Sequence, residues 1–310
     1  METDFVDWLL HRIPADERLE VPPGDDAAVL RPPAGRRTVV TADMLMEGTD
    51  FVLGPDCTPQ AVGNKALAVS LSDLAAMAAR PEAVVVAVAL PRHGGDAIGR
   101  GVHEGLAALA AAHDVALAGG DTNAWDGPLV VSVTALGSVP PGRAWRRDGA
   151  RPGDLLVVTG PCGGSLLGRH LAVRPRCREA LAIAERHVVH AAIDVSDGLS
   201  LDLSRLLAAS GAAGVVDLAA VPIHPDATRL AGQPGATRNA LEHALADGED
   251  FELVLAMPEA DARALVADPP AGLAPVIIGA VEAGSGLVAR DATGARRPLE
   301  PRGFVHRFDG

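Results

Sequence analysis

The sequence predicts a two-domain protein of the α/β class, in its α+β form. Its 310 residues exceed the roughly 100–200 residues of a usual single domain. Segments with strand-like and helix-like periodicity alternate in both halves of the chain, which is typical of folds that combine helices with sheets. Two stretches that contain Pro and Gly, 140–142 and 151–153, flank a candidate boundary. We therefore expect domains at residues 1–140 and 141–310.

The first half begins with a short amphipathic helix over 4–13. A hairpin is expected next, formed by segments 26–30 and 37–42 around the turn Pro-Pro-Ala-Gly. A Thr-Pro pair opens a helix over 58–80, because Thr is a good N-cap and Pro fits the first helical position. One further helix and three strands complete this half: helix 95–112 and strands 83–90, 114–118 and 129–137.

The second half begins with a strand at 154–159, which is followed by a Gly-rich turn at 160–168. After this turn, helices and strands alternate again. They are helices 176–186, 199–210 and 258–267, and strands 190–195, 214–218, 251–257, 274–282 and 286–290.

The composition excludes several classes of protein. The formal net charge is −13 and the chain has no run of Lys or Arg, whereas a nucleic-acid-binding protein usually carries a basic patch. The three cysteines, Cys57, Cys162 and Cys177, have no CxxC spacing, so neither a disulfide framework nor a zinc site is expected. No apolar run reaches the roughly 18–20 residues of a membrane span, and the acidic N-terminus lacks the features of a signal peptide. We expect a cytoplasmic protein that binds neither nucleic acid nor membrane.

Five acidic segments are the candidates for chemistry, because each adjoins glycine, a hydroxyl residue or the end of a strand. A single Asp in such a place is more often a turn residue or a helix N-cap than a ligand. The segments therefore carry weight only as a set. They are Gly24-Asp25-Asp26, Thr41-Ala42-Asp43, Ser72-Asp73, Gly119-Gly120-Asp121 and Asp194-Val195-Ser196-Asp197-Gly198.

Asp73 is the most informative of these residues. Each helical residue turns by about 100°, which places Asp73 in the middle of the apolar stripe of helix 58–80. A buried carboxylate needs a partner, because leaving it unpaired is costly. A salt bridge, for instance to Lys65 or to an arginine, is one interpretation. A metal ion is the other, and the additional aspartates available to share it favour the metal.

A group of aspartates without a counter-ion repels itself. Two unit charges 4 Å apart repel by about 4 kcal/mol at an effective dielectric constant near 20. Mg²⁺ relieves this repulsion, because it takes oxygen ligands and is commonly shared between carboxylates and substrate phosphates. Phosphoryl transfer needs this combination of positioning and charge neutralisation.

The usual nucleotide-binding motifs are absent. There is no Walker A sequence around Lys65 and no H-R-D or D-F-G set. The turn from Gly160 to Ser165 could present backbone N–H groups to a phosphate, but a single Gly-rich turn is weak evidence. Ser196 and Asp197 could bind a ligand or simply cap the helix that follows them.

Taken in order, these motifs resemble the thiamine-monophosphate kinase family, part of the aminoimidazole-ribonucleotide-synthetase-like superfamily. The resemblance covers nearly the whole chain. The matching stretches are GDDAAVL (24–30), TADMLMEGTDF (41–51), KALAVSLSDLAAMAARP (65–81), GGDT (119–122), GRAWRRDGARPGDLLVVTG (142–160), AIDVSDGLSLDL (192–203), GEDFELVL (248–255) and GFVHRF (303–308).

This resemblance implies a metal- and ATP-binding, dimerising N-terminal domain, whose strands build a barrel shared by two subunits of a homodimer. The C-terminal domain completes an active-site cleft. ATP would phosphorylate thiamine monophosphate to thiamine diphosphate with the help of several Mg²⁺ ions. The implied metal ligands are Asp26, Thr41, Asp43, Asp73, Asp121, Asp194 and Asp197. The implied ATP contacts are Gly120, Asp121, Arg147 and Ser196. The implied thiamine-side residues are Glu249, Phe304 and, at a position usually held by His, Asp50.

Several residues depart from the family pattern. Thr49-Asp50 stands where Val-His is usual, and Ala42 replaces a Thr next to the metal site. The metal and ATP side is therefore mostly intact, while the thiamine side is altered. Two alternatives stay open: a superfamily member that uses ATP to activate an amide or carboxamide, and a homologue that binds nucleotide or metal without effective turnover.

Overall fold

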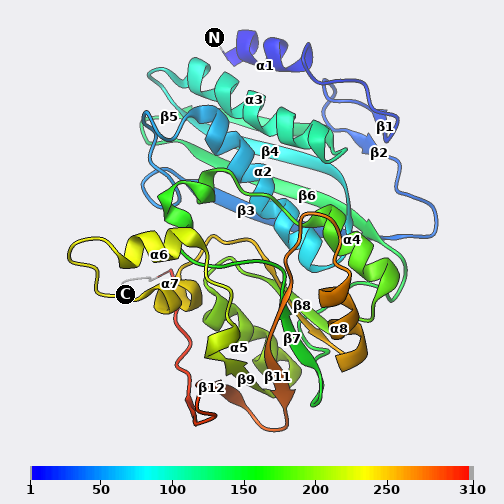
Figure 1. Ribbon diagram of the computed structural model, residues 1–310. Helices are drawn as coiled ribbons and strands as arrows, with labels where there is room; N and C mark the ends of the chain where they lie inside the picture. The colour runs from blue at the N-terminus through cyan, green and yellow to red at the C-terminus, as the bar shows by residue number, and fades with distance from the viewer. Residues whose placement is uncertain (1, 307–310) are drawn as a thin grey trace. The chain divides into compact units, whose positions relative to one another are not determined.

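The computed structural model describes residues 2–306, which form two compact units (Figure 1). The first unit comprises residues 2–74, 79–144 and 171–177, and the second comprises 75–78, 145–170 and 178–306. Each unit combines a β-sheet with helices. This mixed architecture confirms the predicted fold class.

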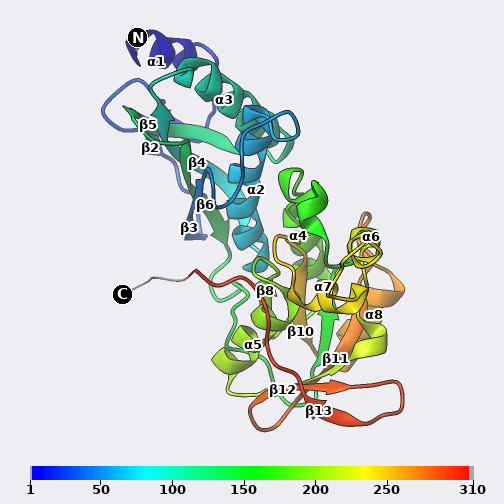
Figure 2. The ribbon, with the colours of Figure 1, turned by 90° about the vertical axis from the view of Figure 1, so that its left-hand side faces the viewer.

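The first unit contains a four-stranded sheet in the order β3-β6-β4-β5. Strand β4 pairs with β6 in antiparallel and with β5 in parallel orientation. Helices α2 and α3 cover one face of the sheet, as the edge-on view in Figure 2 shows. The bounds are β3 (Arg37–Met46), β4 (Arg80–Pro91), β5 (Ala116–Trp125), β6 (Val130–Val139), α2 (Pro59–Ala76) and α3 (Gly95–Ala112).

Glycines let α2 and α3 pack backbone to backbone. A Cβ atom on Gly105 would lie 1.8 Å from the carbonyl oxygen of Gln60, and a Cβ atom on Gly63 would lie 1.9 Å from that of Val102. No side chain fits into such a gap. The two helices therefore cross in close contact, and α2 carries Asp73.

The predicted hairpin of 26–30 with 37–42 is wrong. Strand β2 (Val29–Leu30) pairs with β1 (Leu19–Val21), and helix α1 (Glu2–Leu10) precedes this small ladder. Strand β3 pairs along its whole length with β6, so that Arg37 lies opposite Val139. The partner of β3 is thus about a hundred residues away, and local turn signals could not reveal it.

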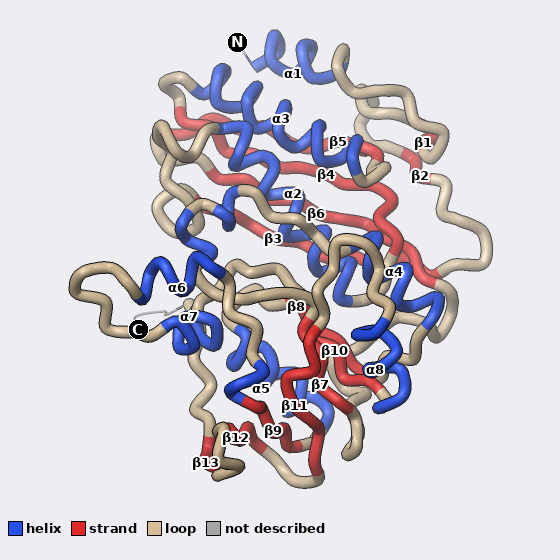
Figure 3. Tube along the Cα trace, in the orientation of Figure 1, coloured by secondary structure: helices blue, strands red, loops and turns tan. Residues whose placement is uncertain are grey.

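The second unit is built on a seven-stranded sheet in the order β13-β12-β9-β11-β7-β10-β8. All neighbouring strands are antiparallel except β9 and β12. The tube view in Figure 3 shows helices beside these strands. The strands are β7 (Leu155–Val158), β8 (Ala191–Asp194), β9 (Ala213–Asp217), β10 (Leu253–Met257), β11 (Val276–Glu282), β12 (Gly286–Arg290) and β13 (Arg296–Pro298). The helices are α4 (Cys177–Arg186), α5 (Leu199–Ser210), α6 (Pro225–Ala231), α7 (Ala240–Ala246) and α8 (Glu259–Ala267).

The core of the second unit consists of aliphatic side chains from its central strands and from α5. It includes Leu156, Ile193, Leu203 and Leu206, all of which are fully buried. Burial of this kind contributes roughly 1.5–3 kcal/mol per large aliphatic side chain. The core therefore fixes the ends of β8 and α5, between which the segment Asp-Val-Ser-Asp-Gly lies. Within residues 2–306, no helix has the length and apolar character needed to cross a membrane.

Candidate active site

Thr41, Asp43 and Asp73 lie together in the first unit. Thr41 and Asp43 are two residues apart on β3, so their side chains lie on the same face of the strand. The Thr41 hydroxyl donates a hydrogen bond to the Asp73 carboxylate of α2. The Ser70 hydroxyl, one turn earlier on α2, donates to Asp43 Oδ2 at 2.7 Å. Three of the seven residues proposed to bind metal are thus neighbours, and Ser70 joins them. Sequence reasoning missed Ser70, although its i, i−3 spacing from Asp73 could have indicated it.

The electrostatics of this cluster are those of two carboxylates without a counter-ion. Burial, followed by the charge of Asp73, raises the pKa of Asp43 to about 6. Lys65, the cation that the sequence offered as a partner for Asp73, donates a hydrogen bond to the Asp50 carbonyl oxygen at 2.8 Å. Carboxylate and hydroxyl oxygens are the donors that Mg²⁺ prefers, so these residues fit that ion.

Asp26, Gly120 and Asp121 line a different part of the first unit. They border a cavity of about 640 Å³ together with apolar residues of α1 and α3, such as Leu9 and Leu106. Strand β5 continues through the Gly-Gly-Asp segment, which the sequence had placed after a shorter strand. A Cβ atom on Gly120 would meet the Val86 carbonyl oxygen at 2.0 Å, so only glycine fits there.

The sheet register separates these two groups of residues. Asp43 lies opposite Val133, which lies opposite Val86, which in turn lies opposite Gly120. Three strand spacings amount to about 14 Å. Within residues 2–306, no group of three or more His, Cys, Asp or Glu side chains could hold a metal ion by itself.

In the second unit, the Asp-Val-Ser-Asp-Gly segment joins β8 to α5. Asp194 ends β8 and is buried. The Glu249 N–H donates to the Ser196 carbonyl oxygen at 2.7 Å, and the Phe304 N–H donates to the Asp197 carbonyl oxygen at 2.9 Å. Five of the residues proposed from the sequence are thus brought together. Residues 307 and 308 of the terminal motif lie outside the described residues.

The backbone at Glu249 is strained. Glu249 has φ 64° and Phe251 has φ 52°, although neither is glycine. Such conformations cost on the order of 1–3 kcal/mol each and cluster at functional sites. The Phe251 N–H donates to the Val195 carbonyl oxygen at 2.8 Å, which helps to hold the strained segment. The strain supports a ligand-facing role for Glu249.

Asp197 has a partner that the sequence did not suggest. Arg205 Nη1 forms an ion pair with Asp197 and also contacts Asp202 Oδ1 at 2.7 Å. Asp202, in the first turn of α5, accepts hydrogen bonds at Oδ2 from the N–H groups of Asp197 and Gly198 just before the helix. Burial raises the pKa of Asp202. Asp202 and Arg205 lie within two helical turns after the Ser-Asp-Gly motif. This closeness in sequence is the signal that could have indicated both of them.

Arg147 and Asp50 are bound through both their own segments and more distant residues. The Arg147 side chain is exposed, and its carbonyl oxygen accepts a hydrogen bond from Ser210 Oγ at 2.8 Å. Asp50 Oδ2 accepts a hydrogen bond from the Met46 N–H at 2.7 Å and thereby closes a turn after β3. Phe304 exposes 51 % of its surface and packs edge-on against His306.

The Gly-rich turn at 160–165 does not offer its amides to phosphate. The Gly163 N–H donates to both oxygens of Asp250, at 3.0 and 2.8 Å, and the Gly164 N–H donates to Asp247 at 2.9 Å. Carboxylates of the chain therefore occupy the places that phosphate oxygens would take. Burial raises the pKa of Asp250 to about 7, although Arg169 lies 2.9 Å away.

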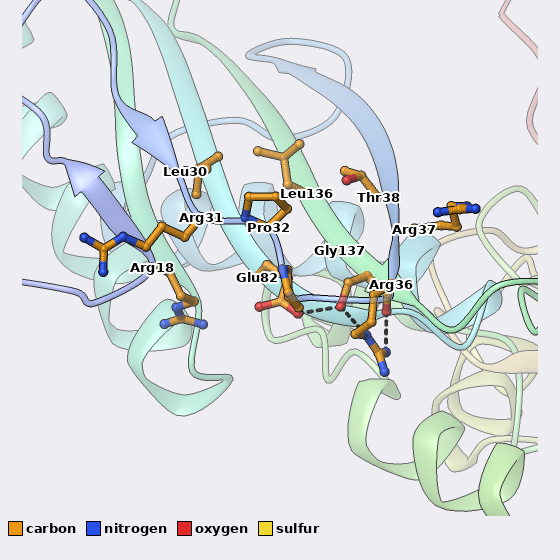
Figure 4. A pocket seen from close by; sticks show the side chains of 12 residues that line it. Arg18, Leu30, Arg31, Pro32, Arg36, Arg37, Thr38, Glu82, Leu136 and Gly137 are labelled. Carbon is orange, nitrogen blue, oxygen red and sulfur yellow. Dashed lines mark hydrogen bonds between the residues drawn. The ribbon is translucent and has the colours of Figure 1, made fainter.

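A second cavity, of about 60 Å³, lies beside the start of β3 (Figure 4). Arg36 crosses its edge and donates from Nε and Nη2 to the hydroxyl and carbonyl oxygens of Ser138, both at 2.8 Å. Ser138 Oγ in turn donates to Glu82 at 2.5 Å. None of the residues proposed from the sequence lines this cavity, so we assign it a structural role only.

Comparisons with known proteins agree with this arrangement. Residues 24–139 match the family "AIR synthase related protein, N-terminal domain", and residues 151–292 match the corresponding C-terminal domain. The chain is 41 % identical to the thiamine-monophosphate kinase of Rhodopirellula baltica over 313 residues, which cover 99 % of this chain and 97 % of that protein.

Solved structures of related proteins have a similar fold. The crystal structure of thiamine-monophosphate kinase from Stenotrophomonas maltophilia K279a superposes with a TM-score of 0.79 at 34 % identity and covers 92 % of this chain and 94 % of its own. The structure "AaThiL complexed with AMPPCP and TMP" has a TM-score of 0.76 at 25 % identity, with coverages of 97 % and 94 %.

Proposed function

The chain belongs to the thiamine-monophosphate kinase family, and from this membership we propose that it transfers the γ-phosphoryl group of ATP to the phosphate of thiamine monophosphate, giving thiamine diphosphate and ADP. The full-length similarity to relatives of that name carries the proposal. A similar structure with AMPPCP and TMP bound supports both substrates. The matches at 24–139 and 151–292 support functional domains at residues 1–140 and 141–310.

Mg²⁺ ions would neutralise the charge that develops on the phosphate oxygens during transfer. In the first unit, we assign them to Thr41, Asp43 and Asp73, and additionally to Asp26 and Asp121. In the second unit, we assign them to Asp194 and Asp197. The raised pKa of Asp43 supports the first assignment, because a cation beside the two carboxylates would remove the cost of keeping both ionised.

The proposed ATP contacts are Gly120, Asp121, Arg147 and Ser196. The cavity next to Gly120 and Asp121 supports the first two, because it combines a polar rim with apolar walls from α1 and α3. Ligand pockets usually measure about 300–1,000 Å³ and have this composition. The apolar part of the cavity would take the base, and the rim would face the polar groups of the nucleotide.

Glu249, Phe304 and Asp50 are the proposed contacts to thiamine monophosphate. The thiazolium ring of this substrate is a cation, and the half-exposed face of Phe304 can attract it. Strain at Glu249 supports its position next to a ligand. Asp50 would add a negative charge on the thiamine side where the family usually places a neutral or positive His.

We further propose a cytoplasmic homodimer. The sheet of the first unit exposes apolar side chains on the face that α2 and α3 do not cover, among them Val40, Met44 and Val85. Contiguous exposed apolar surface usually marks an interaction site. A second copy of the chain would cover this face and continue the sheets into a barrel. The three cysteines are buried thiols that are not joined in disulfides, in keeping with a reducing compartment.

A direct assay tests the function. The protein is incubated with ATP, Mg²⁺ and thiamine monophosphate, and thiamine diphosphate and ADP are quantified by chromatography. We expect both products in equal amounts. ADP without thiamine diphosphate in the presence of another acceptor would indicate amide or carboxamide activation. Nucleotide binding without any product would indicate a homologue that has lost turnover.

A further inference from the structure

Lys65 is the only lysine in the chain. The remaining 26 of the 27 Lys and Arg residues are arginines. It lies on α2 and is fully buried, with 0 % exposure. A buried ammonium group is costly unless it is paired and hydrogen-bonded. A guanidinium group carries five N–H donors in a rigid fork, whereas an ammonium group is compact. The site is therefore built for a small cation.

The Lys65 amine is directed at the turn after β3. Nζ donates a hydrogen bond to the Asp50 carbonyl oxygen at 2.8 Å. Glu47 of the same turn supplies negative charge nearby. Burial raises the pKa of the Cys57 thiol, the charge of Lys65 lowers it, and that of Glu47 raises it again, so both charges act on one buried group.

The rest of the turn is cross-linked by hydrogen bonds at both ends. The Asp50 N–H donates to the Met46 carbonyl oxygen at 2.9 Å, and the Asp50 carboxylate accepts from the Met46 N–H at 2.7 Å. Glu47 accepts from the N–H groups of Leu53 at 3.3 Å and Leu129 at 3.1 Å. Three groups of Asp50 are thus engaged. Leu129 anchors the turn at Glu47, and Lys65 anchors it from α2 at Asp50.

Helix α2 links this turn to the acidic cluster. Lys65 and Asp73 are eight residues apart on one helix, which is about 12 Å along its axis. At Gly63 and Gly105, the backbone of α2 lies in direct contact with that of α3. Helix α2 carries both Lys65 and Asp73. If Lys65 holds the turn, α2 therefore sets the distance between the turn and the Thr41–Asp43–Asp73 cluster.

We propose that Lys65 is a positioning residue for the phosphoryl acceptor: it fixes the 46–53 turn at a set distance from the Thr41–Asp43–Asp73 cluster, so that Asp50 meets a small, cationic phosphate ester in a defined place. The proposal rests on the function proposed above. Lys65 itself contacts neither ATP nor acceptor. Its loss should weaken use of the acceptor more than use of ATP.

Lys65→Met tests this role, because Met has a similar length and no charge. We expect KM for thiamine monophosphate to rise about tenfold or more, since misplacing a contact by 1 Å can cost up to a hundredfold in rate. KM for ATP should stay within about twofold, because the proposed ATP contacts lie outside the 46–53 turn and should keep their positions. Amide hydrogen exchange of residues 46–53 should accelerate. Lys65→Arg should behave like Lys65→Met if a compact cation is required.

The matched control is Arg36→Met. Arg36 also holds a backbone carbonyl oxygen, that of Ser138, and it borders the small cavity, which none of the proposed site residues lines (Figure 4). The Arg36→Met variant should have a lower melting temperature and unchanged KM values for ATP and thiamine monophosphate. If Lys65→Met does not fold, Glu47→Gln loosens the same turn from its other end and should raise the same KM.

The outcomes separate the two proposals. If the unmodified protein makes no thiamine diphosphate, the proposed function fails, and the exchange of residues 46–53 alone decides whether Lys65 holds the turn. If the protein is active but Lys65→Met lowers only the melting temperature, Lys65 is structural and the positioning role is overturned. Equal increases in both KM values would overturn it as well.

Discussion

At the residue scale, the strongest prediction concerns Asp73. Asp73→Asn keeps an oxygen that can accept the Thr41 hydroxyl and removes the negative charge. We expect kcat with Mg²⁺ to fall about a hundredfold or more, as when a main electrostatic contact is removed. The melting temperature should stay close to that of the unmodified protein. Steady-state kinetics and thermal unfolding measure both, with Asp126→Asn in an exposed ion pair as the control. Unfolding of the Asp73 variant would show a structural role instead.

Asp250 leads to a prediction about pH. Its folded pKa of about 7 lies above the ordinary value of 3.8, so the folded state binds the proton more tightly than the unfolded state. The contribution of this group to stability is therefore present below pH 4 and is lost as the pH rises towards 7. In Asp250→Asn, this part of the pH dependence should disappear. Urea unfolding of both proteins at pH 4.5, 5.5 and 7 gives the difference, and an identical pH dependence of the two would contradict the assigned pKa.

At the element scale, the crossing of α2 and α3 depends on glycine. Gly105→Ala would place a methyl group 1.8 Å from the Gln60 carbonyl oxygen, which no rotamer can avoid. The helices must separate, and overpacking of this kind costs typically about 1–3 kcal/mol and occasionally more. We expect at least that loss in the free energy of unfolding. Gly54→Ala is the control, because no atom lies within 4 Å of its added Cβ and its φ is negative or extended. Similar stability of the two variants would refute the argument.

The start of α5 leads to a prediction about metal binding. Arg205 is the counter-ion of Asp197, and a metal ion at Asp197 would have to compete with it. Partly exposed pairs contribute about 0.2–1 kcal/mol, so Arg205→Gln should lower the Mg²⁺ concentration at half-saturation up to about fivefold. The increase of melting temperature with Mg²⁺ alone measures this, with Arg263→Gln as a control of equal charge. Unchanged or weaker Mg²⁺ binding in the Arg205 variant would mean that Arg205 does not compete at this position.

The sequence anticipated individual elements better than their partners. Helix α2 was predicted within a few residues, because a Thr-Pro start and an apolar stripe are local signals. Strand β3 was given the wrong partner, because pairing with β6 is a long-range choice. The short helices α6 and α7 were missed, although Asn239 and Glu242 form a capping box before α7. Arg205 was missed for a related reason, since its importance depends on a turn of α5 facing back to Asp197.

At the scale of the whole molecule, the open face of the first unit's sheet predicts self-association. Val40 exposes 61 % of its surface in the centre of edge strand β3. A long apolar edge strand is unfavourable in an isolated chain. We therefore expect the protein to sediment at about twice the 31.7 kDa of one chain, as a dimer covering such a face would.

Val40→Glu should convert this dimer to a monomer, because a carboxylate buried without a partner in an apolar interface is costly. Val266→Glu is the matched control: this valine on α8 exposes 37 % of its surface and lies outside the sheet of the first unit. Sedimentation equilibrium at several concentrations distinguishes the two. A dimer that persists in Val40→Glu, or a monomer already present in the unmodified protein, would place the apolar face in another role. Because the barrel would be built from the strands that carry Thr41 and Asp43, the monomeric variant should also lose activity if those residues need a second copy to be held in place.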